Sequence, residues 1–351
     1  MRNLLALALA FGLTTAASAQ NNSATVSQTG SSNAADVDQA GGATATVTQS
    51  LEDNVADIDQ VGASTVTLVQ ATATDRFGNQ TDGHSATIQQ IGGDGNIVNL
   101  YQGTSSNSLG AAGSQTADIF QDGSDNVVAG SFDGLDPAVQ DSRSDADADI
   151  DQLGNRNFVD FEDGNELTVL QDGDDNFAQT QGGGVVDIDQ IGNNNDATSM
   201  RIRTSTIYQQ GDDNEATARA FGASADNTVD ISQVGNHNIA TAEQFRTGTF
   251  LVDQDGDWNS ATVDLGSGSG GSAGTTAGLD YDITQNANGF GAAGASNSFD
   301  ATVRFNDNTA TVDQELTGAG MNSISLDQLS AGNTATLTQI GVGNAVTTTQ
   351  N

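Results

Sequence analysis

The chain has 351 residues, no cysteine and a formal net charge of −37, with only nine basic residues. Such an acidic surface repels nucleic acid and anionic membranes, so neither is expected as a partner. A hydrophobic content of 35% with 5% aromatics is poor for one large globular core. It fits a thin core repeated along an axis, or a monomer that is disordered before assembly.

The N-terminus has the features of a secretory signal peptide. Arg2 precedes an apolar run over residues 4–13, and the small residues Ala17 and Ala19 end the segment. The run is too short to span a bilayer. We expect residues 1–19 to be removed on export, and residues 20–351 to form one elongated secreted domain.

Short strands are predicted along most of the mature chain. An apolar residue stands two positions before a Gln again and again, as in Val26 and Gln28, or Ile58 and Gln60. Alternation with a period of two, in segments rich in β-branched residues and Gly, favours β-strand over helix. The apolar residue and the Gln then share one face of the strand.

A second motif follows the strand. The pattern Q-x-G-x-x-N is complete in nine copies, which begin at Gln28, Gln121, Gln152, Gln171, Gln190, Gln209, Gln233, Gln254 and Gln339. Gly and Asn tolerate backbone angles that other residues avoid, so this segment is read as a tight arch between two strands. The arch glycines are Gly30, Gly123, Gly154, Gly173, Gly192, Gly211, Gly235, Gly256 and Gly341.

The regular spacing predicts an all-β fold, a β-solenoid of stacked strand–arch–strand layers. Gln152, Gln171, Gln190 and Gln209 recur every 19 residues. Stacked parallel strands place Gln over Gln and Asn over Asn, so that their amides can form ladders. The predicted assembly ladder comprises Gln28, Asn33, Gln39, Gln152, Asn157, Gln171, Asn176, Gln190, Asn195, Gln209, Asn214, Gln233, Asn238, Gln244, Gln254, Asn259, Gln339, Asn344 and Gln350.

Five segments lack the alternation and are predicted to be loop insertions between layers. They lie near residues 71–84, 103–114, 130–144, 264–280 and 286–301. One of them contains the Gly- and Ser-rich tract 266–272, and another contains Pro137, which strands exclude.

At the repeat, the chain resembles the curlin family, the subunits of bacterial curli fibres. Gln28, Gly30, Asn33, Ala35 and Gln39 occupy every position of the curlin pattern Q-x-G-x-x-N-x-A-x-x-x-Q. The resemblance implies a secreted subunit that polymerises into amyloid fibres at the surface of a Gram-negative bacterium, for cell adhesion and the biofilm matrix. It also implies an outer-membrane export pore and a nucleator subunit as partners.

No catalytic, cofactor or defined metal site is expected. His237 lies in an arch and reads as an exposed turn residue, as does Trp258. The Asp clusters match no EF-hand loop, so weak and diffuse binding of divalent ions is the most that they suggest. The alternative to a fibre subunit is a monomeric acidic β-solenoid that acts as a surface adhesin or binds divalent ions.

Outward-facing aspartates are expected to stack in columns about one strand spacing apart. These residues are Asp36, Asp38, Asp57, Asp59, Asp149, Asp151, Asp187 and Asp189. Like charges this close would repel, and salt, calcium or acid would weaken the repulsion.

Overall fold

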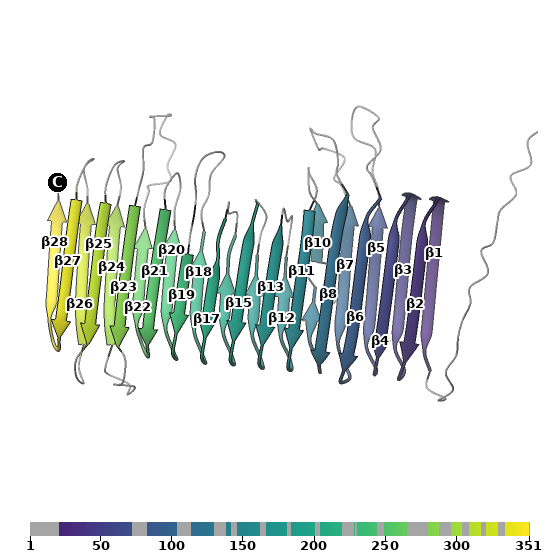
Figure 1. The fold of residues 1–351 in the computed structure, drawn as a ribbon, viewed down its shortest axis with the longest axis horizontal. Helices are drawn as coiled ribbons and strands as arrows, with labels where there is room; N and C mark the ends of the chain where they lie inside the picture. The colour runs from purple at the N-terminus through teal and green to yellow at the C-terminus, as the bar shows by residue number, and fades with distance from the viewer. Residues whose placement is uncertain are drawn as a thin grey trace, which may run out of the picture.

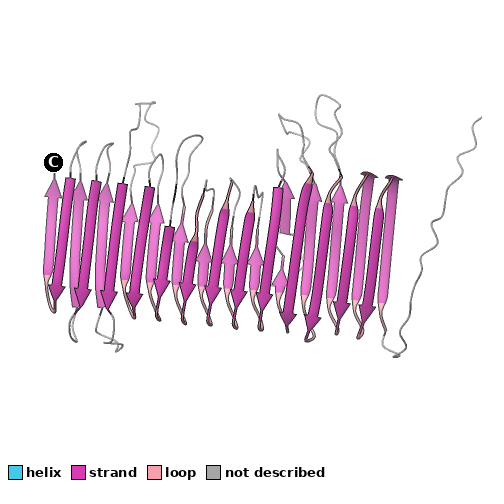
Figure 2. Cartoon of the chain, viewed as in Figure 1, coloured by secondary structure: helices cyan, strands magenta, loops and turns pink. Residues whose placement is uncertain are grey.

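The computed structural model describes residues 21–71, 83–103, 114–129, 138–141, 146–161, 166–180, 184–200, 204–219, 228, 230–243, 249–264, 280–287, 296–303, 309–316, 321–328 and 334–350. The expected signal peptide, residues 1–19, lies outside this range. The described residues form strands and turns without a helix (Figure 2). Consequently, they include no helix long and apolar enough to cross a membrane.

The strands form two long parallel sheets that face each other and extend along one axis (Figure 1). Sheet I contains β1 (Ser23–Ser31), β3 (Thr44–Glu52), β5 (Thr65–Ala71), β7 (Ile97–Gly103), β9 (Val127–Val128), β10 (Ala138–Asp141), β12 (Phe158–Asp160), β14 (Phe177–Gln179), β16 (Asp196–Thr198), β18 (Glu215–Ala218), β20 (Ile239–Glu243), β22 (Ser260–Asp264), β24 (Ser296–Val303), β26 (Met321–Gln328) and β28 (Ala345–Gln350).

Sheet II contains β2 (Ala34–Ala40), β4 (Val55–Val61), β6 (Ser85–Gly92), β8 (Gln115–Gly123), β11 (Ala146–Leu153), β13 (Leu167–Asp172), β15 (Val186–Ile191), β17 (Ile207–Gln210), β19 (Asp230–Val234), β21 (Thr249–Gly256), β23 (Asp280–Ala287), β25 (Thr309–Leu316) and β27 (Thr334–Gly341). The chain alternates between the sheets, and each strand pairs with the strand one layer away. The predicted all-β solenoid of stacked parallel strands is confirmed.

The core is a thin layer between the two sheets. In sheet II one column of fully buried side chains runs through Ile58, Ile88, Ile119, Ile150 and Ile188, in the register of the strand pairing. Fully burying one such side chain contributes about 1.5–3 kcal/mol. Each layer adds one more, so the stack needs few apolar residues per layer.

Sheet I is narrower in the middle of the molecule. There β12, β14 and β16 have three residues each, and the buried residues at their centres are Val159, Ala178 and Ala197. They belong to the same core cluster as the Ile column of sheet II. Short sheet I strands explain how these layers are completed in 19 residues.

Two of the predicted loops extend too far. β24 occupies 296–303, which overlaps the end of the segment 286–301, and pairs with both β22 and β26. The segment lacks the Gln–Gly motif, but Asn297 and Phe299 point inward in the regular alternation and are buried. Likewise β10 lies within 130–144 and continues sheet I beside β7. Most of the remaining loop residues lie outside the described range.

Candidate assembly ladders

One glutamine from each of the 13 strands of sheet II forms a continuous ladder through the core. Its members are Gln39, Gln60, Gln90, Gln121, Gln152, Gln171, Gln190, Gln209, Gln233, Gln254, Gln285, Gln314 and Gln339. Each Nε2 donates to the Oε1 of the next member toward the C-terminus, at 2.7–2.9 Å. The ladder therefore satisfies buried amides and has one direction throughout.

Sheet I carries a second and shorter glutamine ladder. Gln28 donates to Gln49, Gln49 to Gln70 and Gln70 to Gln102, at 2.7–2.8 Å. At the other end of the sheet, Gln350 lies opposite Gln328 in the strand register. The short central strands of sheet I end before this position, so no glutamine of those strands continues the ladder. The glutamines of the predicted assembly ladder thus belong to two ladders, one in each sheet, and Gln244 lies outside the described residues.

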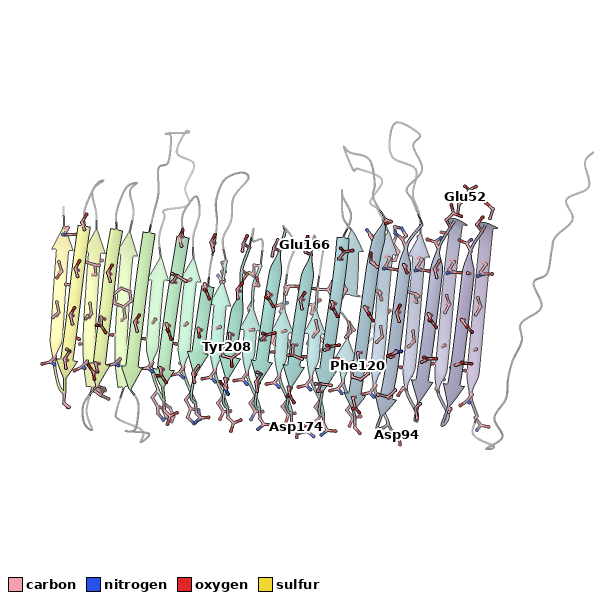
Figure 3. All side chains as sticks on the ribbon, viewed as in Figure 1. Glu52, Asp94, Phe120, Glu166, Asp174 and Tyr208 are labelled. Atoms are coloured by element: carbon pink, nitrogen blue, oxygen red, sulfur yellow. The ribbon has the colours of Figure 1, made fainter. Side chains whose placement is uncertain are left out.

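The asparagines are divided between two edges of the solenoid. Figure 3 shows Asp94 and Asp174 at one edge, here named the lower edge, and Glu52 and Glu166 at the opposite, upper edge. The lower edge holds a ladder of Asn96, Asn126, Asn157, Asn176, Asn195, Asn214, Asn238 and Asn259. The backbone N–H of each member donates to the Oδ1 of the member before it, at 3.0–3.1 Å.

Further along the lower edge, Asn344 bonds to Asn322 in the same way, at 3.2 Å. Asn33, by contrast, lies at the upper edge. Its Oδ1 accepts the backbone N–H of Asn54, and the Oδ1 of Asn54 accepts that of His84. Asn33 therefore stacks with Asn54 at the upper edge and not with the asparagines of the lower edge, because the first complete motif bridges sheet I to sheet II and the later motifs bridge sheet II to sheet I.

All nine predicted arch glycines have positive φ, from 98° at Gly256 to 135° at Gly173. At Gly173 the close stacking of layers adds a second constraint, since a Cβ there would overlap the backbone carbonyl of Gly192. The arch thus needs glycine both for its backbone angle and for the approach of the neighbouring layer. Asp175, two residues later, also has positive φ, at 60°.

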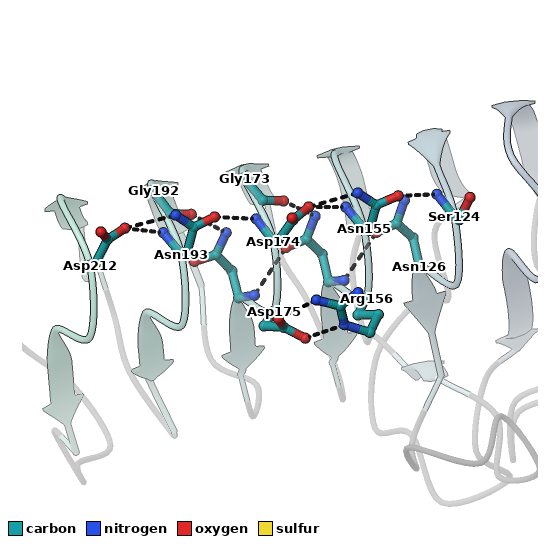
Figure 4. A network of polar contacts seen from close by, with 12 residues as sticks. Ser124, Asn126, Asn155, Arg156, Gly173, Asp174, Asp175, Gly192, Asn193 and Asp212 are labelled. Carbon is teal, nitrogen blue, oxygen red and sulfur yellow. Dashed lines mark hydrogen bonds and ion pairs between the residues drawn. The ribbon is translucent and has the colours of Figure 1, made fainter.

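A further ladder at the lower edge was not predicted. It runs through the residue after the arch glycine in six successive layers, and asparagine alternates with aspartate: Asn155, Asp174, Asn193, Asp212, Asn236 and Asp257. Figure 4 shows the part of this ladder from Asn155 to Asp212. Each Asn donates its backbone N–H and Nδ2 to the Oδ1 of the following Asp. Carboxylates are therefore never in adjacent layers of this ladder. The alternation of asparagine and aspartate is visible in the sequence, at the position directly after the glycine of the motif.

Beside this ladder, exposed side chains of successive arches pair with one another. Arg156 holds Asp175 through two hydrogen bonds of 2.5 and 2.6 Å, which lower the pKa of Asp175. His237 lies 3.5 Å from Asp213, and its ring centroid is 4.1 Å from that of Trp258. His237 and Trp258 lie in arches, as predicted, and both are partly exposed.

His84 was not predicted to be structural, yet it is fully buried at the upper edge. Its Nδ1 accepts the backbone N–H of Gln115 at 3.3 Å, which is the role that Oδ1 of Asn54 plays one layer earlier. Burial lowers its pKa from 6.5 to about 4. The neutral ring therefore replaces an asparagine of the ladder.

The outward aspartates stack less regularly than predicted. Asp36 lies opposite Asp57, and Asp38 opposite Asp59. Elsewhere the columns are interrupted: Asp187 lies opposite Thr168, and Asp189 lies between Leu170 and Tyr208. Burial and the neighbouring Asp57 raise the pKa of Asp59. Among the described residues, no group of His, Asp and Glu side chains is arranged to hold a metal ion.

Comparison with known protein families gives one match. Residues 19–50 match the curlin associated repeat, and this range includes β1, β2 and most of β3. No curated protein matches the chain. The glutamine ladder of sheet II begins in the matched range at Gln39 and continues through the later layers to Gln339. The match confirms the resemblance to the curlin family at the first repeats of the chain.

Proposed function

We propose that this protein is a secreted structural subunit that polymerises into curli-like amyloid fibres for cell adhesion and the biofilm matrix. The curlin repeat at residues 19–50 supports a fibre subunit rather than an enzyme. The observation that carries the proposal is the complementarity of the two ends of the solenoid. β1 and β2 end the two sheets on one side, and β27 and β28 end them on the other.

The direction of the glutamine ladder makes the two ends unlike. Gln339, the last member, accepts from Gln314, and its Nε2 is the group that would donate to a further layer. Gln39, the first member, donates to Gln60, and its Oε1 is the group that would accept. Apart from β10, sheet I has 14 strands and sheet II has 13, so the next copy continues both sheets only after a half-turn about the long axis. β1 and β2 of that copy then stack on β27 and β28, so that Gln339 would donate to Gln28 and Gln350 to Gln39. Two like ends would instead bring two donors or two acceptors together.

The asparagine ladder supports the same orientation. In it, each member donates its backbone N–H to the preceding layer, so the Oδ1 of Asn344 would receive the N–H of Asn33 from the next copy. Asn33 already holds the equivalent position within its own copy, because its Oδ1 accepts the backbone N–H of Asn54. The two ladders have opposite donor directions, and both are continued by the same head-to-tail contact.

Apolar side chains at both ends are only partly buried. Val26 and Val37 at the first layer, and Leu337 and Val346 at the last, pack against the core on one side. A second copy would cover the other side of each. Burial of apolar surface contributes roughly 25 cal/mol per Å², and the open backbone groups of the edge strands would pair at the same time.

The proposal extends to location and partners. A secreted fibre subunit of this kind would leave a Gram-negative cell through an outer-membrane pore and polymerise on a nucleator at the cell surface. The supports for this step are the signal peptide expected from residues 1–19 and the resemblance to the curlin family.

The test uses the purified mature chain, residues 20–351, incubated at low salt and neutral pH. We expect a rise in thioflavin fluorescence after a lag, and unbranched fibres by electron microscopy. Preformed fibres should remove the lag. A chain that stays monomeric, with no fluorescence and no fibres even when seeded, would contradict the proposal and favour the monomeric adhesin.

A further inference from the structure

Charge is distributed unequally between the outer faces of the two sheets in the N-terminal third. Among β1, β3, β5 and β7 of sheet I, the only charged residue is Glu52, at the end of β3. The adjoining strands β2, β4 and β8 of sheet II carry Asp36, Asp38, Asp57, Asp59, Asp118 and Asp122. In a chain of net charge −37, an uncharged surface of this extent is unusual.

The uncharged surface is regular and rich in β-branched side chains. Thr25, Thr46 and Thr67 form one column, and Thr48, Val69 and Tyr101 form part of the next. We name the surface made by these six residues the threonine face. They alternate with the buried residues of the same strands and are exposed or half-buried. No described strand of the chain covers this face.

We propose that the threonine face is a lateral contact between solenoids, occupied by the threonine face of a second copy. Strands with high β-propensity, no charge and no proline are typical of the tight interfaces between paired sheets. β1, β5 and β7 meet all three conditions. The outer face of sheet II cannot form such a contact at low salt, since it would bring aspartates of two copies together.

The size of the face indicates when this contact forms. Four strands about 4.8 Å apart and seven residues of about 3.3 Å give roughly 440 Å² per copy. A stable interface buries about 800 Å² on each partner, so one pair of faces is weak. A fibre presents the face once per subunit, and many weak contacts then act together. This inference rests on the proposed function, because only fibres present enough copies of the face to bundle side by side. Single chains would pair weakly.

The test compares two variants with equal charge changes. Thr46→Asp with Thr67→Asp places two carboxylates on the threonine face, and Ser85→Asp with Thr87→Asp places two on β6 of sheet II. By electron microscopy, we expect the first variant to form single fibres and the second to form bundles like those of the wild type. Equal bundling of the two variants would overturn the proposal.

A fluorescent label detects the lateral contact directly, without a measurement of bundle width. The sequence has no cysteine, so Thr44→Cys at the rim of the face and Thr87→Cys on sheet II each give one site for pyrene. Along a fibre, the labels of successive copies are about 65 Å apart, because one copy adds 14 strands to one sheet and 13 to the other at about 4.8 Å per strand. Excimer fluorescence therefore reports lateral contact.

We expect excimer fluorescence at position 44 and none at position 87, with fluorescence falling when Thr46→Asp and Thr67→Asp are added. Excimers at position 44 in concentrated protein that forms no fibres would reject the proposed function and still support the lateral contact. Absence of excimers at position 44, with or without fibres, would overturn the lateral contact. Loss of excimers on adding a soluble polysaccharide, with the polysaccharide bound instead, would also overturn it and identify the face as a glycan-binding surface.

Discussion

The glutamine ladder of sheet II can be tested inside a single chain with two neighbouring glutamines of β6. Gln90 is fully buried, donates to Gln121 at 2.7 Å and accepts from Gln60 at 2.8 Å. Gln89 points outward and is exposed. Gln90→Ala and Gln89→Ala therefore remove the same atoms from the same strand, once from the ladder and once from the surface.

Gln90→Ala leaves two buried groups without their partner, the Oε1 of Gln121 and one N–H of Gln60. Each buried polar group left unsatisfied costs about 1–3 kcal/mol, so we expect a loss of about 2–6 kcal/mol in the free energy of unfolding of the layers around β6. Exposed substitutions usually change it by no more than about 0.5 kcal/mol, which is the expectation for Gln89→Ala.

Urea unfolding of the monomer at low salt, followed by far-UV circular dichroism, measures the difference. Hydrogen exchange shows which strands lose stability, because in a stacked repeat the stability of each layer depends on contacts with its neighbours. Protection should fall for β4, β6 and β8 in Gln90→Ala and remain unchanged in the distant strand β25. If the two variants have equal urea midpoints and equal exchange, the ladder does not stabilise the fold and the reasoning is refuted.

Three further predictions concern assembly and pH. Burial, and then the nearest carboxylate, raise the pKa of Asp59, Asp118 and Asp189. The folded chain thus takes up these protons at higher pH than the unfolded chain, and the stabilisation they bring is lost as pH rises through the raised pKa values. We expect the lag of fibre formation to shorten at about pH 4, with added salt, or with calcium; a lag unaffected by all three would show that the aspartates do not control assembly. Deleting residues 267–278 should leave fibres intact by electron microscopy, since loop length costs little; loss of fibres would mean that a layer was removed. His84→Asn should flatten the pH dependence of the urea midpoint. In the wild type, the unfolded ring takes up a proton below about pH 6.5 and the buried ring only near 4, so roughly 3 kcal/mol of stability is lost between these values; an equal pH dependence in the variant would exclude this role.

Much of the fold was predictable because the alternation has a period of two and survives every insertion. Ile58, Ile88 and Ile119, each two positions before a ladder glutamine, are buried in the expected column. The end of the loop near 286–301 was missed because Phe299 fills a core position that Ala261 holds one layer earlier, without the Gln–Gly motif. In that segment, the alternation of inward and outward residues was the only sequence feature that indicated a strand.

The ladders were predictable in chemistry but not in arrangement. The motif connects a strand of one sheet to a strand of the other, but its sequence does not show which sheet comes first. The sequence therefore could not show that Asn33 and Asn157 lie at opposite edges. In the first layers both sheets carry the glutamine, as Gln28 and Gln39 do, whereas the central layers carry it in sheet II alone. His84 was missed because its structural role depends on being buried at an asparagine position, which no local pattern reveals.

The most direct test of head-to-tail stacking is seeded fibre growth of a chain altered only in its last layer. The variant Gln339→Ala, Asn344→Ala and Gln350→Ala removes the inward amides that would meet the next copy. The matched control, Thr336→Ala, Thr338→Ala and Thr349→Ala, alters outward residues of the same two strands, β27 and β28. With wild-type fibres as seeds, elongation by the first variant should be several-fold slower than by the control, which should match the wild type. Equal elongation rates for all three proteins would contradict assembly through the ladders.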